Sequence, residues 1–191
     1  MGPMKQLALV LFIVIFSHSL VLSAGAAPAP TPKTGETTSY AARDDGALQP
    51  GVAWPAPRFV DNANGSVTDN LTGLTWLKDA NCFGSQTWDN ALAKANTLAS
   101  GACSLGDGSE AGDWHLPNKN ELWSLVDYGH SSPSLPAGHP FTSVQSSYYW
   151  SGSTYADSTN FAWFVNMYYR DAARQRGERS LEWPSRCWFC A

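Results

Sequence analysis

The residues whose chemistry is easiest to predict are the four cysteines, Cys82, Cys103, Cys187 and Cys190. Cysteines pair in an oxidising compartment, and four of them allow three different pairings. The spacing favours Cys82 with Cys103, a bridge that closes a loop of about twenty residues and contributes roughly 3 kcal/mol to stability in the chain-entropy description. We therefore expect this pair to have a structural role.

The last two cysteines have the Cys-x-x-Cys spacing of redox centres. In such centres the N-terminus of a following helix lowers the pKa of one thiol. Only Ala191 follows Cys190 in this sequence. We therefore expect Cys187 and Cys190 to form a local or intermolecular disulfide rather than a redox centre, and the sequence does not choose between these pairings.

The histidines and acidic residues do not predict a metal site. His115, His130 and His139 are scattered, and none has the sequence spacing of a metal ligand relative to a cysteine or a carboxylate. The stretch from Asp61 to Asn70 is rich in Asn and Asp, but no register of it matches an EF-hand loop, so we expect turns there. We expect neither a metal nor another cofactor.

Catalytic motifs are not found either. An acyl-transfer enzyme or a metalloprotease would show a pattern such as Gly-x-Ser-x-Gly or His-Glu-x-x-His, and the sequence contains neither. We therefore expect a binding protein rather than an enzyme.

Basic and aromatic residues gather near the end of the chain. Five of the seven arginines fall within the last twenty-two residues, although the formal net charge of the chain is -4. Arginine forks bind sulfate or carboxylate bidentately, and aromatic faces stack on sugar rings. The predicted ligand-binding residues are Tyr168, Tyr169, Arg170, Arg174, Arg176 and Arg179. A solvated strand-and-loop face without a ligand fits the same residues, and the negative net charge argues against a nucleic-acid partner.

The start of the chain predicts export. A lysine at position 5, an apolar run from Leu7 to Leu22 and a group of small residues after it are typical of a cleaved signal peptide, which we place at residues 1–26. A permanent membrane anchor is the weaker alternative, because His18 and two serines interrupt the apolar run. No later stretch is long and apolar enough to cross a membrane, so we expect a secreted or periplasmic protein.

Two further segments follow from composition. Residues 27–55 are rich in Ala, Pro, Thr and Gly and poor in large apolar side chains, so we expect a flexible spacer. Residues 56–191 contain every cysteine and eight of the nine tryptophans, which predicts one domain with one core.

Local patterns predict the elements of that domain. Asn64-Gly65 between short β-prone runs indicates a hairpin and, with a second turn before Trp76, an N-terminal β-meander. Thr87 can cap an amphipathic helix that ends by Gly101. Asn118 and Glu121 form an Asn-x-x-Glu capping box at the start of a second amphipathic helix. The aromatic stretch from Ser147 to Tyr169 indicates strands of an antiparallel sheet, so the fold class is α+β.

Five motifs occur in a fixed order, and together they resemble one known family. They are Arg58 to Asn62, Gly65 to Trp76, Gly112 to Asn118, Glu121-Leu122 and Tyr149 to Ser153. The pattern is similar to the C-terminal domain family of the Legionella collagen-like adhesin, the Lcl C-terminal domain, over about Arg58 to Arg186. The resemblance implies a C-type-lectin-like fold, related to formylglycine-generating enzymes, and an adhesin-like binding function.

The end of the sequence departs from that family. Members usually close with a Trp-Pro-Val-Arg-Gly type of ending, whereas here Trp183-Pro184 continues to Ala191. Either the final strand is altered or a tail is appended. The segment from Tyr168 to Glu182 is also richer in arginine than the resemblance implies.

These observations lead to a secreted or periplasmic module that binds an extracellular polyanionic glycan or protein surface through its C-terminal strand-and-loop region. The resemblance also implies two alternatives, a variable binding protein diversified by a retroelement over 168–182 and, less favoured, an enzyme of the formylglycine-generating type. Adhesin relatives form trimers, so a homo-oligomer is a further expectation.

Overall fold

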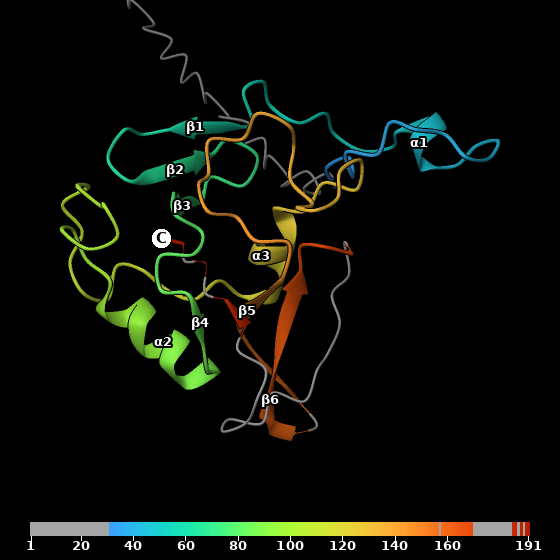
Figure 1. Ribbon diagram of the computed structural model, residues 1–191. Helices are drawn as coiled ribbons and strands as arrows, with labels where there is room; N and C mark the ends of the chain where they lie inside the picture. The colour runs from blue at the N-terminus through green and yellow to red at the C-terminus, as the bar shows by residue number, and fades with distance from the viewer. Residues whose placement is uncertain (1–30, 157, 170–184, 187, 189) are drawn as a thin grey trace, which may run out of the picture.

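The computed structural model describes residues 31–156, 158–169, 185–186, 188 and 190–191. Its elements follow the order that the sequence predicts: a meander, two helices and a C-terminal sheet, with one short additional helix before them (Figure 1). The bounds are α1 (Asp45–Leu48), β1 (Phe59–Asp61), β2 (Ser66–Asp69), β3 (Thr75–Leu77), β4 (Ser85–Gln86), α2 (Trp88–Thr97), α3 (Lys119–Ser124), β5 (Tyr148–Tyr155), β6 (Ser158–Asn166) and β7 (Ser185–Arg186). The α+β class predicted from the sequence is confirmed.

The meander forms an antiparallel sheet in the order β1-β2-β3, which confirms the predicted hairpin. Gly65 adopts a φ of +84° in the turn, and a Cβ on it would lie 2.2 Å from the carbonyl oxygen of Ser104. Only glycine combines this positive φ with such a close approach of another backbone segment. The Asn-Gly pair therefore sets both the turn and the packing of the chain after α2.

The Asn and Asp residues of the meander make turns, as predicted. The Oδ1 atom of Asp61 accepts a hydrogen bond from the backbone N–H of Ala63 at 3.0 Å, and that of Asn64 accepts one from Ser66 at 3.2 Å. Each side chain bonds to the backbone two residues later, which is the geometry of an Asx turn. The local structure of this stretch is accounted for by these bonds.

Helix α2 begins where the sequence predicts and ends earlier than predicted. Thr87 is its N-cap and accepts a hydrogen bond from the backbone N–H of Asn90 at 3.3 Å. The helix stops at Thr97, before Gly101, and Leu98 already has an extended backbone and a buried side chain. The predicted disulfide between Cys82 and Cys103 is present and encloses the helix.

Helix α3 has the predicted capping box. The Oδ1 atom of Asn118 accepts from the backbone N–H of Glu121 at 3.0 Å, and the Oε2 atom of Glu121 accepts from the backbone N–H of Asn118 at 2.8 Å. The predicted apolar stripe of Leu122, Leu125 and Val126 is buried, although Leu125 and Val126 follow the last helical residue.

The second sheet has the strand order β4-β7-β5-β6. Strands β5 and β6 pair antiparallel, as predicted, whereas β7 pairs antiparallel with β4 and parallel with β5. Trp88 on α2 donates from its indole nitrogen to the carbonyl oxygen of Ser151 at 2.8 Å, so α2 is tied to β5. The sheet is therefore mixed rather than wholly antiparallel, because a short last strand returns to its centre.

The end of the chain packs close to β3 (Figure 1), with Trp188 and Cys190 buried and Ala191 exposed. The side chain of Trp188 is 0% exposed, and its indole N–H donates to the carbonyl oxygen of Leu77 at 2.8 Å. Its ring lies 4.7 Å from that of Phe141, measured between centroids. The described residues of this end therefore pack into the core and do not form a separate tail. That the final strand differs from the family's stays a prediction.

An ion pair joins the meander to α3. Arg58 and Asp69 are both buried, and Nε of Arg58 lies 3.3 Å from Oδ1 of Asp69. Arg58 also donates from Nη2 to the carbonyl oxygen of Ser124, the last residue of α3. A buried charge pair requires such additional hydrogen bonds to offset its desolvation, so this contact fixes α3 against the meander.

The described part of the predicted spacer makes contacts with itself and with the domain. The backbone of Val52 bonds to that of Thr31 at 3.0 Å, and the indole N–H of Trp54 donates to the carbonyl oxygen of Lys33 at 2.8 Å. The backbone N–H of Tyr128 donates to the carbonyl oxygen of Thr34 at 3.0 Å. The domain boundary at residue 55 stays a prediction, but residues 31–55 do make contacts with the domain.

Among the described residues, none of the helices has the length and apolar character that crossing a membrane requires.

Candidate functional site

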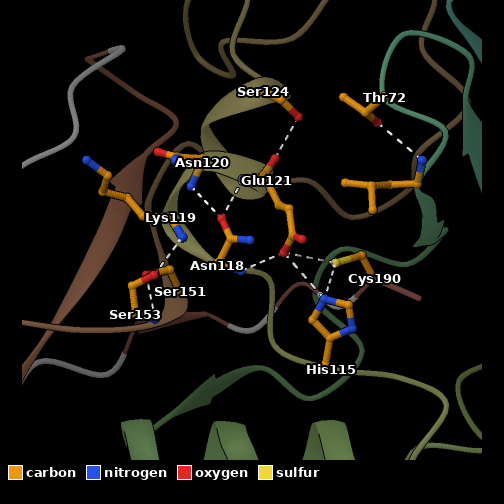
Figure 2. A network of polar contacts seen from close by, with 11 residues as sticks. Thr72, His115, Asn118, Lys119, Asn120, Glu121, Ser124, Ser151, Ser153 and Cys190 are labelled. Atoms are coloured by element: carbon orange, nitrogen blue, oxygen red, sulfur yellow. Dashed lines mark hydrogen bonds and ion pairs between the residues drawn. The ribbon is translucent and has the colours of Figure 1, made fainter. Parts of the chain in front are cut away.

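Three side chains with reactive or metal-binding atoms meet beside the start of α3: His115, Glu121 and Cys190. The Nε2 atom of His115 lies 3.3 Å from Sγ of Cys190 and 3.4 Å from Oε2 of Glu121. The sulfur and the carboxylate oxygen are 4.0 Å apart. Figure 2 shows the three groups pointing toward one another from three separate segments.

The backbone fixes two of these residues against each other. The N–H of His115 donates to the carbonyl oxygen of Cys190 at 2.9 Å, and the N–H of Cys190 donates back at 3.1 Å. The next residue, Ala191, exchanges two similar bonds with Thr75 in β3. Cys190 is therefore held between β3 and the segment before α3, and its position does not depend on its side chain.

The capping box of α3 fixes the third residue, Glu121. Oε2 of Glu121 is the atom that closes the capping box with Asn118, and it is also the atom nearest to His115 and Cys190. One short sequence motif thus starts α3 and aims a carboxylate at the histidine and the cysteine. The link between α3 and β5 lies next to it, where the backbone N–H of Lys119 donates to Oγ of Ser153 at 3.0 Å (Figure 2).

A glycine in β5 permits this arrangement. The backbone N–H of Gly152 donates to the carbonyl oxygen of Pro117 at 2.7 Å. A Cβ on Gly152 would lie 2.8 Å from the carbonyl oxygen of Leu116, so a larger residue would push β5 away from the segment that carries His115.

The three side chains differ in exposure. The side chain of His115 is 50% exposed and that of Glu121 is 27% exposed, whereas Cys190 is fully buried. Burial raises the pKa of the Cys190 thiol far above its ordinary value, and the negative charge of Glu121 raises it further. Without a metal, Cys190 is therefore a protonated thiol at neutral pH and a weak nucleophile, because the thiolate is the reactive form.

The geometry differs from that of a catalytic triad. In a triad the nucleophile contacts one ring nitrogen of the histidine, and the carboxylate contacts the other. Here the sulfur and the carboxylate oxygen both approach the same atom, Nε2 of His115. The arrangement is one in which three donor atoms converge on a common point.

The predicted binding residues lie elsewhere. Tyr168 and Tyr169 follow β6 and are 45% and 70% exposed, with their ring centroids 4.4 Å apart. The buried Asn166 accepts through Oδ1 from the backbone N–H of Tyr168 at 2.9 Å and so shapes the turn. The four arginines of the predicted surface fall outside the described residues: Arg170, Arg174, Arg176 and Arg179.

The remaining cysteines and histidines have individual environments. Cys190 carries a free thiol, so the expected local disulfide is not formed at this residue. An intermolecular disulfide stays a prediction, and Cys187 lies outside the described residues. Nδ1 of His130 lies 2.8 Å from Oδ2 of Asp127, three residues before it. His139 packs on Phe141, with ring centroids 5.8 Å apart. His115 is therefore the described histidine that meets both a carboxylate and a thiol.

Sequence reasoning found the parts of this cluster but did not join them. His115 belongs to the Gly112 to Asn118 motif, Glu121 belongs to the predicted capping box, and Cys190 belongs to the Cys-x-x-Cys pair. However, Cys190 is 75 residues from His115, and only the pairing of the chain end with the 115 segment brings them together. The one usable signal was the ending that departs from the family pattern.

Comparison with known families settles which family the domain resembles. A family model described as the Lcl C-terminal domain matches residues 65–187. The chain belongs to the Lcl C-terminal domain family. The matched region includes His115, Glu121, Tyr168 and Tyr169, whereas Cys190 lies beyond its end. No curated protein and no solved structure matches the chain. The C-type-lectin-like fold stays a prediction.

Proposed function

We propose that this protein is an exported, adhesin-like binding module that recognises a polyanionic glycan or a protein surface through the region at the end of β6. Membership of the Lcl C-terminal domain family is consistent with extracellular binding. The Cys82–Cys103 disulfide is consistent with an oxidising compartment outside the cytoplasm. Catalysis has less support, because the His115 cluster lacks the geometry of a triad.

The observation that carries the proposal is the exposure of Tyr168 and Tyr169 side by side. The other aromatic side chains described in residues 56–191 are buried or partly buried, but these two are 45% and 70% exposed. Tyrosines are rigid, have one apolar face and one polar end, and are enriched in binding interfaces. A pair of such rings at one turn is therefore suited to contact with a sugar ring or a partner side chain.

The sequence after the two tyrosines supplies the charge. Arg170 follows Tyr169 directly, and Arg174, Arg176 and Arg179 follow within nine more residues. Guanidinium groups bind sulfate and carboxylate bidentately, which a lysine cannot do in the same way. The combination of stacking rings and forked cations favours a sulfated or carboxylated glycan over a neutral one.

The experiment compares the purified mature protein on dextran sulfate and on unmodified dextran, two polymers that differ in their sulfate groups. We expect binding to dextran sulfate alone, with affinity that falls as the salt concentration rises, because exposed charge pairs are screened. The Arg174→Ala/Arg176→Ala variant should weaken binding and reduce the salt dependence. A glycan and protein array run beside it identifies a protein partner if both polymers fail.

A matched pair of variants tests the tyrosines. Tyr168→Ala/Tyr169→Ala should weaken binding to dextran sulfate about tenfold, which corresponds to about 1.4 kcal/mol. Tyr40→Ala is the control, because Tyr40 is 83% exposed and precedes the matched region. Equal binding by the double variant and the wild type would contradict the proposed site, and no binding on either polymer or the array would contradict the proposed function.

A further inference from the structure

We propose that His115, Glu121 and Cys190 form a binding site for a zinc-type divalent metal ion, with three protein ligands and one open coordination position. The three donor atoms are an imidazole nitrogen, a carboxylate oxygen and a sulfur, all within 4.8 Å of one another. They come from three separate segments: the strand-like stretch before α3, the first turn of α3, and the end of the chain.

The distances fit a tetrahedral ion. Zinc binds nitrogen, oxygen and sulfur ligands at about 2.0–2.3 Å, so neighbouring ligands of a tetrahedral site lie about 3.3–3.6 Å apart. The observed separations are 3.3 Å from sulfur to nitrogen, 3.4 Å from nitrogen to oxygen and 4.0 Å from sulfur to oxygen. Two edges of the triangle already fit, and a small shift of the Glu121 side chain closes the third.

The donor types favour zinc over other biological cations. Calcium and magnesium prefer an all-oxygen environment, whereas thiolate and imidazole suit zinc and the neighbouring transition metals. Carboxylate and thiolate together carry two negative charges, which balance a divalent ion. The cysteine proton is displaced when the metal binds, because the thiolate is the ligand.

The surroundings hold the ligands in place before a metal arrives. The backbones of His115 and Cys190 are bonded to each other in both directions, and the capping box orients Glu121. A carboxylate oxygen has two lone pairs, so Oε2 can accept the N–H of Asn118 and still bind a metal. Such hydrogen bonds to ligand atoms from surrounding groups are a regular feature of metal sites.

The site is closed on one side and accessible on the other. Cys190 is buried, while the side chain of His115 is half exposed, so an ion at the common point would be reached from the histidine side. The fourth position would be open to water or to an anionic ligand. A bound metal would also join the end of the chain to α3 and stabilise the folded state by mass action.

The test uses the purified mature protein, treated with chelator and then titrated with Zn²⁺ by calorimetry and with Co²⁺ by absorption spectroscopy. We expect one Zn²⁺ per chain, a higher midpoint temperature of unfolding on addition of Zn²⁺, and a thiolate-to-cobalt charge-transfer band with Co²⁺. The charge-transfer band reports the cysteine directly, because carboxylate and imidazole ligands do not produce it.

Three variants locate the site, and two more are controls. His115→Gln and Cys190→Ser should each weaken Zn²⁺ binding at least a hundredfold, and Glu121→Gln should weaken it to a smaller extent. His130→Gln is the matched control, because His130 forms a similar histidine–carboxylate pair with Asp127 but belongs to no cluster with a thiol in the described part of the chain. Cys187→Ser should retain the charge-transfer band, which separates this site from binding by the Cys-x-x-Cys pair.

Two results would overturn the proposal. One is wild-type protein that takes up neither Zn²⁺ nor Co²⁺; the other is binding that survives both His115→Gln and Cys190→Ser. If Cys190→Ser fails to fold because its side chain is buried, His115→Gln decides the question, since its side chain is half exposed. Metal uptake lost in Cys187→Ser but kept in His115→Gln would assign the ion to the cysteine pair instead.

Discussion

Two aromatic regions near the end of the sequence differ in burial. Trp188 is fully buried among Phe141, Tyr149 and Trp76, and its only polar atom, Nε1, donates to the carbonyl oxygen of Leu77. Tyr168 and Tyr169 stand in solvent at the end of β6 and contact each other. Aromatic composition alone does not separate the two regions.

The difference lies in what the backbone pairs with. The residues around Trp188 are paired with β3, β5 and the 115 segment, so the indole ring is carried into the core. The turn after β6 bonds locally to Asn166, and this leaves its side chains outside. One region stabilises the fold, and the other is available for a ligand.

The largest expected effect is on the buried region. Trp188→Ala should lower the free energy of unfolding by about 3–5 kcal/mol, because it removes a large ring from a closely packed core. Urea unfolding followed by circular dichroism measures this. A loss below about 1 kcal/mol would show that the chain end does not belong to the core.

The next effect comes from the disulfide. Cys82→Ala/Cys103→Ala should cost about 3 kcal/mol, through a loop that holds α2 and does not include the chain end. Combined with Trp188→Ala, the two losses should couple, because β4 lies inside the disulfide loop and pairs with β7, which ends two residues before Trp188. Strict additivity in a double-mutant cycle would contradict this link.

A smaller effect is expected from pH. Burial lowers the pKa of His139 below its ordinary value of 6.5, and the folded state therefore disfavours the protonated ring. The free energy of unfolding should fall as the pH drops below 6.5, because the unfolded state takes up the proton more readily. His139 packs on Phe141, which packs on Trp188, so this pH dependence arises next to the buried region. Urea unfolding at pH 7.5 and 5.0 should show a shallower decline for His139→Gln; an unchanged decline would count against the assignment.

The smallest effect on stability is expected at the exposed region. Tyr168→Ala/Tyr169→Ala should change the free energy of unfolding by less than about 0.5 kcal/mol for each residue, because neither ring is buried. The same urea experiment measures it. A loss comparable to that of Trp188→Ala would place the tyrosines in the core and remove the distinction between the regions.

Local signals in the sequence predicted much of the fold. The Asn64-Gly65 turn, the Thr87 cap and the Asn118-Glu121 capping box each depend on residues a few positions apart, and each is present. Strands β4 and β7 have two residues each and no periodicity, so no window of sequence could reveal them. The burial of Trp188 depends on the same long-range pairing.

One of the two candidate sites could be predicted from the sequence, and the other could not. Exposed aromatic residues at the end of β6 followed from composition and position. The approach of Cys190 to His115 did not, since it spans 75 residues and depends on where the last strand returns. Spacing rules for metal ligands apply to neighbours in sequence, and here the geometry arises from tertiary structure.

Hydroxyl-radical footprinting with and without dextran sulfate tests the contrast between the two regions most directly. We predict that Trp188 is protected in both samples, and that Tyr168 and Tyr169 are labelled in the free protein and protected by the polymer, while Tyr40 is labelled equally in both. Labelling of Trp188 in the free protein, or unchanged labelling of the two tyrosines at saturating polymer, would contradict the account.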